Sequence, residues 1–504
     1  MKCLFWVNQF LRLLFALSVC TITTYVIQGR FYSSLSVCLF ILGMIVLQLP
    51  RLKWTWYFLS IVGSLLLPMA MITNGACFSY STVSTVLATN VQETFGFLES
   101  LPLGLFNCAL LSLIGHSLVI VLIHSFDQRT SALDLFSNKV KTIGIAFLAI
   151  ACTYMSYHQV WDKVFKPIYD GFQLMRMSDM PETTWHRTGN LSSSKNYEVY
   201  VLVIGESLRR DMVSFYGNRF ETTPFLNQVP KVYIADYLAT AVNTSLAVPQ
   251  ILALPDTVSP NVREGENILA LANSLGYETS WISAQGFSGK YDLTTSRIAR
   301  YAQHLNFDAE QDFEMVPLFA KQLEQSAQKP QLIVLHMMGS HEYPCGMLSQ
   351  WGIRFETNQG EMENCYLSSV SKTDEFLRRI IEQLKTSGKT YSLIYQSDHA
   401  QNHVKTRDGY KVFRSDKIKQ TYQIPFFMIA SDMKQTRLVN VQRSAFHFVE
   451  YFPTWLGVET NLTPHGYDIF NNESEQEVQV LNYQGHLQNY GSLKEGLSAQ
   501  DIFK

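Results

Sequence analysis

Residues 197–207 read YEVYVLVIGES, an apolar run that ends in a glycine, a glutamate and a serine. The run is rich in valine and tyrosine, which favour extended chain, so it predicts a buried β-strand over residues 197–204. Glu206 follows this strand closely. A carboxylate in that place is suited to binding a metal ion, although a glutamate before a helix can also serve only to stabilise the helix start.

The rest of the second half of the chain alternates short apolar runs with helical patterns. This alternation predicts an α/β domain whose mainly parallel central sheet is covered by helices on both faces. In such a sheet the functional groups gather beyond the carboxyl ends of the strands. The further predicted strands are 278–283, 331–335, 392–395 and 425–430, and the predicted helices are 268–275, 314–327 and 369–386.

A second acidic group follows the strand predicted at 392–395, which leads into Asp398 and His399. Aspartate and histidine supply the oxygen and nitrogen ligands that zinc accepts. Such a pair is common by itself. Together with Glu206, however, it places two acidic strand ends in one domain, and this favours a metal site.

Two histidines follow the strand predicted at 331–335, and they flank a glycine turn. Histidines in this setting can orient a phosphate or bind a second metal ion. We expect such a role for His341, whereas His336 fits a loop histidine with ordinary hydrogen bonds.

The first part of the chain is dominated by apolar runs. Each of five segments is long and apolar enough to cross a bilayer, which takes about 20 residues. A cleaved signal peptide is the alternative for the first segment, but four more spans follow it. The segments are residues 9–28, 32–50, 54–73, 103–123 and 141–157.

The distribution of positive charge predicts the orientation of these spans. Lysine and arginine gather before the first span and in two of the loops, whereas Arg30 stands alone on the opposite side. The N-terminus is therefore expected in the cytoplasm, and an odd number of crossings places the chain after residue 157 outside. The gathered charges are Lys2, Arg12, Arg51, Lys53, Arg129, Lys139 and Lys141.

The predicted organisation has three parts: a transmembrane domain (1–157), a connecting segment (158–196) and a soluble domain (197–504). Between Trp161 and Met175, apolar residues recur at helical spacing, which indicates a helix lying on the membrane or packing against the soluble domain. Residues 187–196 are rich in serine, glycine and asparagine and are expected to form a linker.

Two cysteines, Cys345 and Cys365, lie in one polar stretch of the soluble half. A disulfide that closes a short surface loop would suit an oxidising compartment such as the periplasm, and two unrelated thiols are the alternative. The net charge of −2 gives no support for nucleic-acid binding, which needs a concentrated basic face.

Six short motifs occur in a recognisable order along the chain. In this order and spacing they resemble the phosphoethanolamine transferases of the alkaline phosphatase/sulfatase superfamily, which include lipid A modifying enzymes linked to polymyxin resistance. The resemblance spans nearly the whole chain, including five membrane spans before a periplasmic domain. The motifs are GES at 205–207, YG at 216–217, TTP at 222–224, TSLAVP at 244–249, HMMGSH at 336–341 and SDH at 397–399.

The resemblance assigns roles to individual residues of this chain. Thr244 corresponds to the nucleophile and also contacts the metal, in preference to the neighbouring hydroxyls of Ser207 and Ser245. His341 corresponds to a histidine near the phosphoryl group. The expected ligands of a catalytic Zn²⁺ are Glu206, Asp398 and His399, and the expected contacts to the head group of the lipid donor are Thr89 and Glu93.

The chain departs from the family pattern after Asp398 and His399. Ala400 and Gln401 stand where a glycine and a glutamate are common, and cysteines that flank the nucleophile in some members are absent. A further family histidine has no match near Lys411 and Phe413, so His403 is the expected substitute in substrate binding. These departures leave a second metal ion open and point to a separate subgroup.

The resemblance implies transfer of phosphoethanolamine from phosphatidylethanolamine to a lipopolysaccharide or lipooligosaccharide acceptor through a phospho-threonine intermediate. The acceptor group is a lipid A phosphate, an inner-core heptose or another periplasmic glycan, and the departures favour a core sugar. The implied location is the bacterial inner membrane, with the catalytic domain in the periplasm.

Other functions fit this sequence less well. A phosphoglycerol transferase would share the fold and differ in donor recognition. A sulfatase normally needs a Cys/Ser-x-Pro-x-Arg motif, and none follows Glu206. A non-catalytic scaffold or lipid sensor would be favoured by loss of a ligand, yet the expected ligands are present. A transporter is disfavoured because the spans contain few ionisable groups, with His116 as the main exception.

Overall fold

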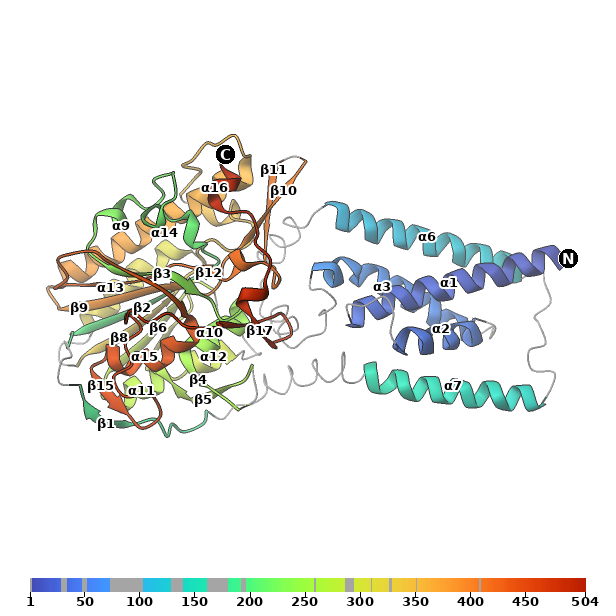
Figure 1. Ribbon diagram of the computed structural model, residues 1–504, viewed down its shortest axis with the longest axis horizontal. Coiled ribbons are helices and arrows are strands. Elements are labelled where there is room, and N and C mark those ends of the chain that lie inside the picture. The colour runs from blue at the N-terminus through green and yellow to red at the C-terminus, as the bar shows by residue number, and fades with distance from the viewer. Residues whose placement is uncertain are drawn as a thin grey trace. The chain divides into compact units, whose positions relative to one another are not determined.

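The computed structural model describes two compact units, an N-terminal helical unit and a C-terminal α/β unit, and each is considered by itself (Figure 1). Residues 73–102, which include Thr89 and Glu93, and residues 161–179, the predicted membrane-surface helix, lie outside the described residues. The described residues are 2–28, 34–47, 52–72, 103–127, 139–160, 180–191, 196–257, 260–285, 294–309, 311–325, 329–349, 351–407 and 409–504.

Each of the five predicted membrane segments corresponds to a helix in the described part of the chain. Three stretches of these helices, Trp6–Ile27, Lys53–Met71 and Asn107–Phe126, are long and apolar enough to cross a membrane. The described apolar parts of the other two helices are shorter, so five crossings remain a prediction. The helices are α1 (Lys2–Gln28), α2 (Ser34–Val46), α3 (Lys53–Ile72), α6 (Leu103–Asp127) and α7 (Lys139–Val160).

His116 of α6 forms a polar bridge between three of these helices. Its Nε2 lies 2.9 Å from the hydroxyl of Ser18 in α1, and its Nδ1 lies 3.2 Å from the hydroxyl of Ser64 in α3. The Ser64 hydroxyl is also 2.7 Å from that of Ser112. Hydrogen bonds between small hydroxyl side chains are a common means of joining membrane helices, so packing accounts for this ionisable residue.

The central sheet of the α/β unit is mixed: five pairings between its described strands are parallel, as expected for most of the sheet, and three are antiparallel. β2 lies between β8 and β9 and is parallel to both, but β13 is antiparallel to β9 and β3, and β12 is antiparallel to β3. Nine described strands form the sheet: β2 (Val199–Gly205), β3 (Val232–Leu238), β6 (Glu278–Ser283), β7 (His304–Asn306), β8 (Gln331–His336), β9 (Tyr391–Ser397), β12 (Gln423–Ile424), β13 (Phe426–Ala430) and β14 (Arg437–Ser444).

Both faces of β2 are buried because its side chains alternate between two cores. Tyr200, Leu202 and Ile204 belong to one apolar cluster, and the intervening valines belong to the other. Helices from the two clusters cover opposite faces of the sheet (Figure 1). The first cluster includes residues of α10 (Thr244–Leu252), α11 (Ile268–Ser274) and α15 (Phe448–Trp455), and the second includes residues of α13 (Met315–Gln325) and α14 (Glu361–Thr386).

The pairing register brings the ends of three strands to one level. Ile204 of β2 is paired with His336 of β8 and with Gln396 of β9, and Gly205 is paired with Ser397. The residues that follow therefore leave the same edge of the sheet together. This places Glu206 beside Asp398, as expected for neighbouring parallel strands. A separate hairpin, formed by β10 (Asn402–Thr406) and β11 (Gly409–Phe413), follows β9.

The predicted linker is wrong at its start, because part of it is a strand. β1 (Arg187–Asn190) pairs antiparallel with β15 (Val458–Thr460). Just before it, the ring of Trp185 is fully buried and its Nε1 donates a hydrogen bond of 2.8 Å to the Thr460 hydroxyl. The α/β unit thus begins before residue 197, and residues 180–191 belong to its packed structure.

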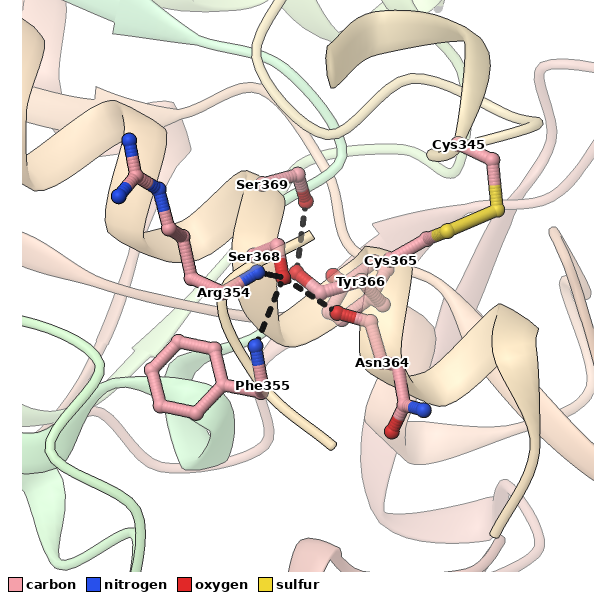
Figure 2. The surroundings of a disulfide bond; sticks show 8 residues. All are labelled: Cys345, Arg354, Phe355, Asn364, Cys365, Tyr366, Ser368 and Ser369. Carbon is pink, nitrogen blue, oxygen red and sulfur yellow. Dashed lines mark hydrogen bonds between the residues drawn. A yellow bond between two sulfur atoms is a disulfide. The ribbon is translucent and has the colours of Figure 1, made fainter. Parts of the chain in front are cut away.

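Cys345 and Cys365 form a disulfide, which confirms the pairing expected from the sequence (Figure 2). Their Cα atoms are 4.9 Å apart, and Cys365 lies in the first turns of α14. Near this bond the Ser368 hydroxyl accepts a 2.8 Å hydrogen bond from the backbone N–H of Arg354 (Figure 2). The segment after β8 is therefore attached to α14 by a covalent bond and by a hydrogen bond.

Replacing both Cys345 and Cys365 by serine should lower the free energy of unfolding by about 3 kcal/mol, since the bond closes a loop with a sequence separation of 20. Denaturant unfolding of the full chain in detergent measures this change. Adding reductant to the parent should reproduce the loss and leave the double variant unchanged. Equal stability of the parent and the variant would contradict the prediction.

His336 is a core residue at the end of β8 rather than a loop histidine. Its ring is buried, packs edge-on against Trp281 with centroids 5.6 Å apart, and lies near Ser283. Its Nε2 has no hydrogen-bond partner among the described residues. Burial lowers the pKa of His336 to about 4, although the charges of Glu206 and Asp312 act in the opposite direction.

His336 should therefore make the α/β unit sensitive to acid. Its pKa is about 4 in the folded protein and about 6.5 in the unfolded chain, so the unfolded chain binds the extra proton between these values. Stability then falls as the pH falls from about 6.5 towards 4, by about 2 kcal/mol between pH 7 and pH 5. Urea unfolding should show a smaller loss in His336→Gln. His465→Gln, at an exposed position, is the control and should behave like the parent.

Candidate active site

Glu206, Asp398 and His399 form a buried group beyond the ends of β2 and β9. Their ligand atoms all lie within 4.8 Å of one another, and the three side chains are fully buried. His399 Nε2 is 3.3 Å from Glu206 Oε1 and 3.4 Å from Asp398 Oδ2. Two carboxylates and an imidazole that converge in this way form a candidate site for a metal ion.

The environment of His399 prepares its Nε2 to act as a ligand. Nδ1 lies 3.2 Å from the carbonyl oxygen of Ala400, and because a carbonyl can only accept, Nδ1 carries the proton. The lone pair of the neutral ring is then on Nε2, which faces both carboxylates. Burial lowers the pKa of His399 to about 4 despite the opposing charge of Glu206, so the ring is neutral near pH 7.

The same group contains buried polar atoms without partners, and a bound cation would compensate for them. Asp398 Oδ2 and His399 Nε2 are buried and have no hydrogen-bond partner among the described residues. Burial, reinforced by the negative charge of Glu206, raises the pKa of Asp398 well above its ordinary value. Since unpaired buried polar atoms are costly, the residues present fit a bound divalent cation.

Glu206 is held by the unusual backbone of the next residue. Ser207 adopts a positive φ of 59°, and its N–H donates a 3.1 Å hydrogen bond to Asp398 Oδ1. Its hydroxyl donates a 2.5 Å hydrogen bond to Glu206 Oε1, and its carbonyl accepts one of 2.6 Å from the Tyr366 hydroxyl. Ser207 is thus a buried support of the candidate ligand group.

Thr244 is the first residue of α10, and its hydroxyl donates a 2.8 Å hydrogen bond to Glu206 Oε2. The side chain is only partly buried, so a substrate can reach it. Asn243 caps the helix by accepting a 3.0 Å hydrogen bond from the N–H of Leu246, and the Ser245 hydroxyl donates to this cap at 3.3 Å. The helix start also provides a partial positive charge, which favours an anion beside Thr244.

The loop after β8 packs directly on the backbone of Glu206. Gly339 has a φ of +50°, and a Cβ there would lie 2.7 Å from the carbonyl oxygen of Glu206, so the close approach requires glycine. The N–H of Ser340 donates a 3.0 Å hydrogen bond to that oxygen. His341, which follows, is partly buried and interacts electrostatically with the Glu206 carboxylate, so the loop brings it to the site.

Several supporting residues could not be recognised from the sequence. Asp312 accepts hydrogen bonds from the N–H groups of Met338 at 2.7 Å and Gly339 at 3.1 Å, and it is paired with Lys372 of α14 at 2.8 Å. Gln285 donates a 3.0 Å hydrogen bond to Glu206 Oε2. These residues lie far from Glu206 along the chain and show no local motif.

An ion pair joins Glu342 to Arg414, with Nε donating to Oε1 at 2.8 Å and Nη2 to Oε2 at 3.2 Å. The sequence interpretation did not include either residue. In contrast, His403 is not brought into the group of Glu206. Its ring is buried and its Nδ1 is 2.8 Å from Glu363, so the structure gives no support to its expected role in substrate binding.

Comparisons with known proteins identify the family of the chain. The chain matches the sulfatase family over residues 198–458. It is 29% identical to phosphoethanolamine transferase OpgE of Escherichia coli (strain K12), over 82% of each chain, and 28% identical to a putative phosphoethanolamine transferase of Haemophilus influenzae, over 79% of this chain and 85% of that one.

Two solved structures share the fold. One is the integral membrane lipooligosaccharide phosphoethanolamine transferase A (EptA) from Neisseria meningitidis, with a TM-score of 0.57, 16% identity and coverage of 91% of this chain and 96% of that one. The other is the periplasmic domain of EptC from Escherichia coli in complex with Zn, with a TM-score of 0.52, 20% identity and coverage of 62% and 98%. The resemblance expected from the motifs is confirmed, and the chain belongs to the sulfatase family, with relatives named phosphoethanolamine transferases.

Proposed function

We propose that this chain transfers phosphoethanolamine from phosphatidylethanolamine to a lipopolysaccharide or lipooligosaccharide acceptor, with Thr244 as the nucleophile. The observation that carries the proposal is the contact between Thr244 and Glu206. It joins a partly exposed hydroxyl, at the positive end of a helix, to a buried group of candidate metal ligands. The relatives named phosphoethanolamine transferases support the identity of the transferred group.

The metal ion that we propose for the site is Zn²⁺. Two carboxylates and one neutral imidazole are ligands that zinc accepts, and Glu206, Asp398 and His399 would hold the ion together with the Thr244 oxygen. When bound, Zn²⁺ lowers the pKa of a coordinated hydroxyl and offsets negative charge on the attacked phosphate. The related EptC domain was solved in complex with Zn. The proposal concerns one catalytic ion and makes no claim about a second metal ion.

The reaction is a double displacement at phosphorus. The Thr244 oxygen forms a bond to phosphorus, and the bond from phosphorus to the diacylglycerol oxygen breaks. The Thr244 proton leaves through its hydrogen bond to Glu206, and His341 supplies a proton to the departing diacylglycerol. An acceptor oxygen then attacks the phospho-threonine, and the bond from phosphorus to the Thr244 oxygen breaks. The Thr244 oxygen takes its proton back from Glu206, and His341 takes up the acceptor's proton.

The membrane setting suits amphiphilic substrates. We propose that the helices of the N-terminal unit cross the bacterial inner membrane five times and leave the α/β unit in the periplasm, where the disulfide would be stable. The donor head group would contact Thr89 and Glu93. The acceptor would be an inner-core sugar or a lipid A phosphate, and a relative named Kdo(2)-lipid A phosphoethanolamine 7''-transferase, 22% identical, supports this class. Sulfate ester hydrolysis does not fit a threonine nucleophile.

Thr244→Ala should abolish transfer, because it removes the oxygen that bonds to phosphorus. Mass spectrometry of lipopolysaccharide from cells with the parent protein should show a mass increment of one phosphoethanolamine. The increment should be absent with Thr244→Ala, reduced with Thr244→Ser and unchanged with the neighbouring control Ser245→Ala. A phosphoethanolamine increment that persists in Thr244→Ala would exclude this nucleophile.

Asp398→Asn should lower zinc affinity by at least tenfold, since it replaces a charged ligand with a neutral amide. Metal content after dialysis at fixed free zinc measures this directly. Zinc should also raise the melting temperature of the metal-stripped parent more than that of Asp398→Asn. Glu382→Gln, on the exposed side of α14, is the matched control and should bind zinc like the parent. Equal zinc binding by Asp398→Asn would contradict the assignment.

A further inference from the structure

Arg414 is brought to the edge of the site by the hairpin of β10 and β11. The hairpin begins three residues after His399, and its strands are antiparallel. Asn402 at its start is paired with Phe413 at its end, so Arg414 leaves the hairpin beside the segment that contains His399. Because neighbouring strands are about 5 Å apart, the backbone of Arg414 lies close to a candidate metal ligand.

Glu342 reaches the same place from the loop after β8. Two residues before it, the N–H of Ser340 is bonded to the carbonyl oxygen of Glu206 at 3.0 Å, which fixes this part of the loop on the site. The Glu342 carboxylate then accepts two hydrogen bonds from Arg414, of 2.8 and 3.2 Å. Two separate segments that carry site residues are therefore joined by this ion pair.

The ion pair orients the guanidinium and leaves part of it available. An arginine has five N–H donors in one plane, and Glu342 engages one on Nε and one on Nη2. Within the described parts of the chain, Arg414 makes no further hydrogen bond. Its side chain is 13% exposed, against 3% for Glu342, so part of the Arg414 side chain reaches solvent.

The charge of Arg414 acts on the ligand group. The guanidinium interacts electrostatically with both Glu206 and His399, which are candidate metal ligands. A phosphodiester carries its negative charge on two non-bridging oxygens, and a planar guanidinium edge matches two such oxygens with parallel hydrogen bonds.

A purely structural ion pair is the alternative explanation. It would tie the hairpin to the loop after β8 and would need no donors beyond those that Glu342 uses. Buried ion pairs often add little to stability, because desolvation offsets their attraction. The unused donors at the edge of the site favour a binding role over a structural role alone.

We infer that Arg414, oriented by Glu342, binds the non-bridging oxygens of the phosphoryl group that Thr244 attacks. The inference rests on the proposed phosphoryl transfer at Thr244. It makes Arg414 a substrate-binding residue of the phosphate subsite and Glu342 its positioning residue. The ligand class is a phosphate monoester or diester, whatever alcohol is attached to it.

The test is phosphate binding to the full chain in detergent, loaded with zinc and without an acceptor. Isothermal titration calorimetry with inorganic phosphate and with O-phosphoethanolamine gives Kd values. Arg414→Ala should weaken both by roughly ten- to a hundredfold, the usual effect of losing a charge-assisted pair of hydrogen bonds. Arg414→Lys keeps the charge but not the planar edge, so its Kd values should lie between those of the parent and those of Arg414→Ala.

The controls separate binding from folding. Arg378→Ala removes an arginine that is paired with Glu375 on α14, and it should bind phosphate like the parent. Zinc content and melting temperature identify any variant that fails to fold. Parent-like phosphate Kd values in folded Arg414→Ala and Arg414→Lys, or no phosphate binding by the parent, would overturn the inference. The calorimetric test measures phosphate binding and not transfer. A failure of this inference can therefore be told apart from a failure of the proposed phosphoethanolamine transfer.

Discussion

The structure of the site depends on one constraint, the register in which β2 lies between β8 and β9. All three strands end at the same level, so the chain must turn away from the sheet there in three adjacent places. Glu206 and Asp398 are consequently side by side and fully buried. Two neighbouring buried carboxylates are unfavourable, and the surrounding residues hold this arrangement in place.

Much of that support comes from α14. This helix provides Tyr366, which is bonded to the backbone of Ser207, and Lys372, which is paired with Asp312 beneath the loop after β8. The Ser369 hydroxyl is bonded to that of Ser340 in the same loop. One helix therefore contacts both the turn that presents Glu206 and the loop that presents His341. A movement of α14 would alter the two together.

The sequence predicted those elements whose pattern of residues lies within one short segment. The strands β2 and β8 are largely apolar runs. Two acidic strand ends in one domain favoured a metal site, and the resemblance assigned Glu206, Asp398 and His399 to it. In contrast, β3 and β14 were missed because polar residues such as Asp236 and Gln442 interrupt their apolar pattern. Asp312, Gln285 and the pair of Glu342 with Arg414 could not be predicted, since their contacts join distant segments and depend on side-chain packing. The antiparallel direction of β13 could not be predicted either, because an apolar run does not reveal the direction of its strand in the sheet.

The disulfide has a consequence for the loop that carries His341 and Glu342. Cys345 lies three residues after Glu342, so the bond to Cys365 fixes the far end of the segment that carries His341 and Glu342. The disulfide therefore restrains these side chains from one end of their segment. A chain that kept both thiols reduced would lack this restraint, whereas the hydrogen bonds from Ser207 to Glu206 and Asp398 do not involve the bond. The order of this loop is in this way tied to the redox conditions under which the chain folds.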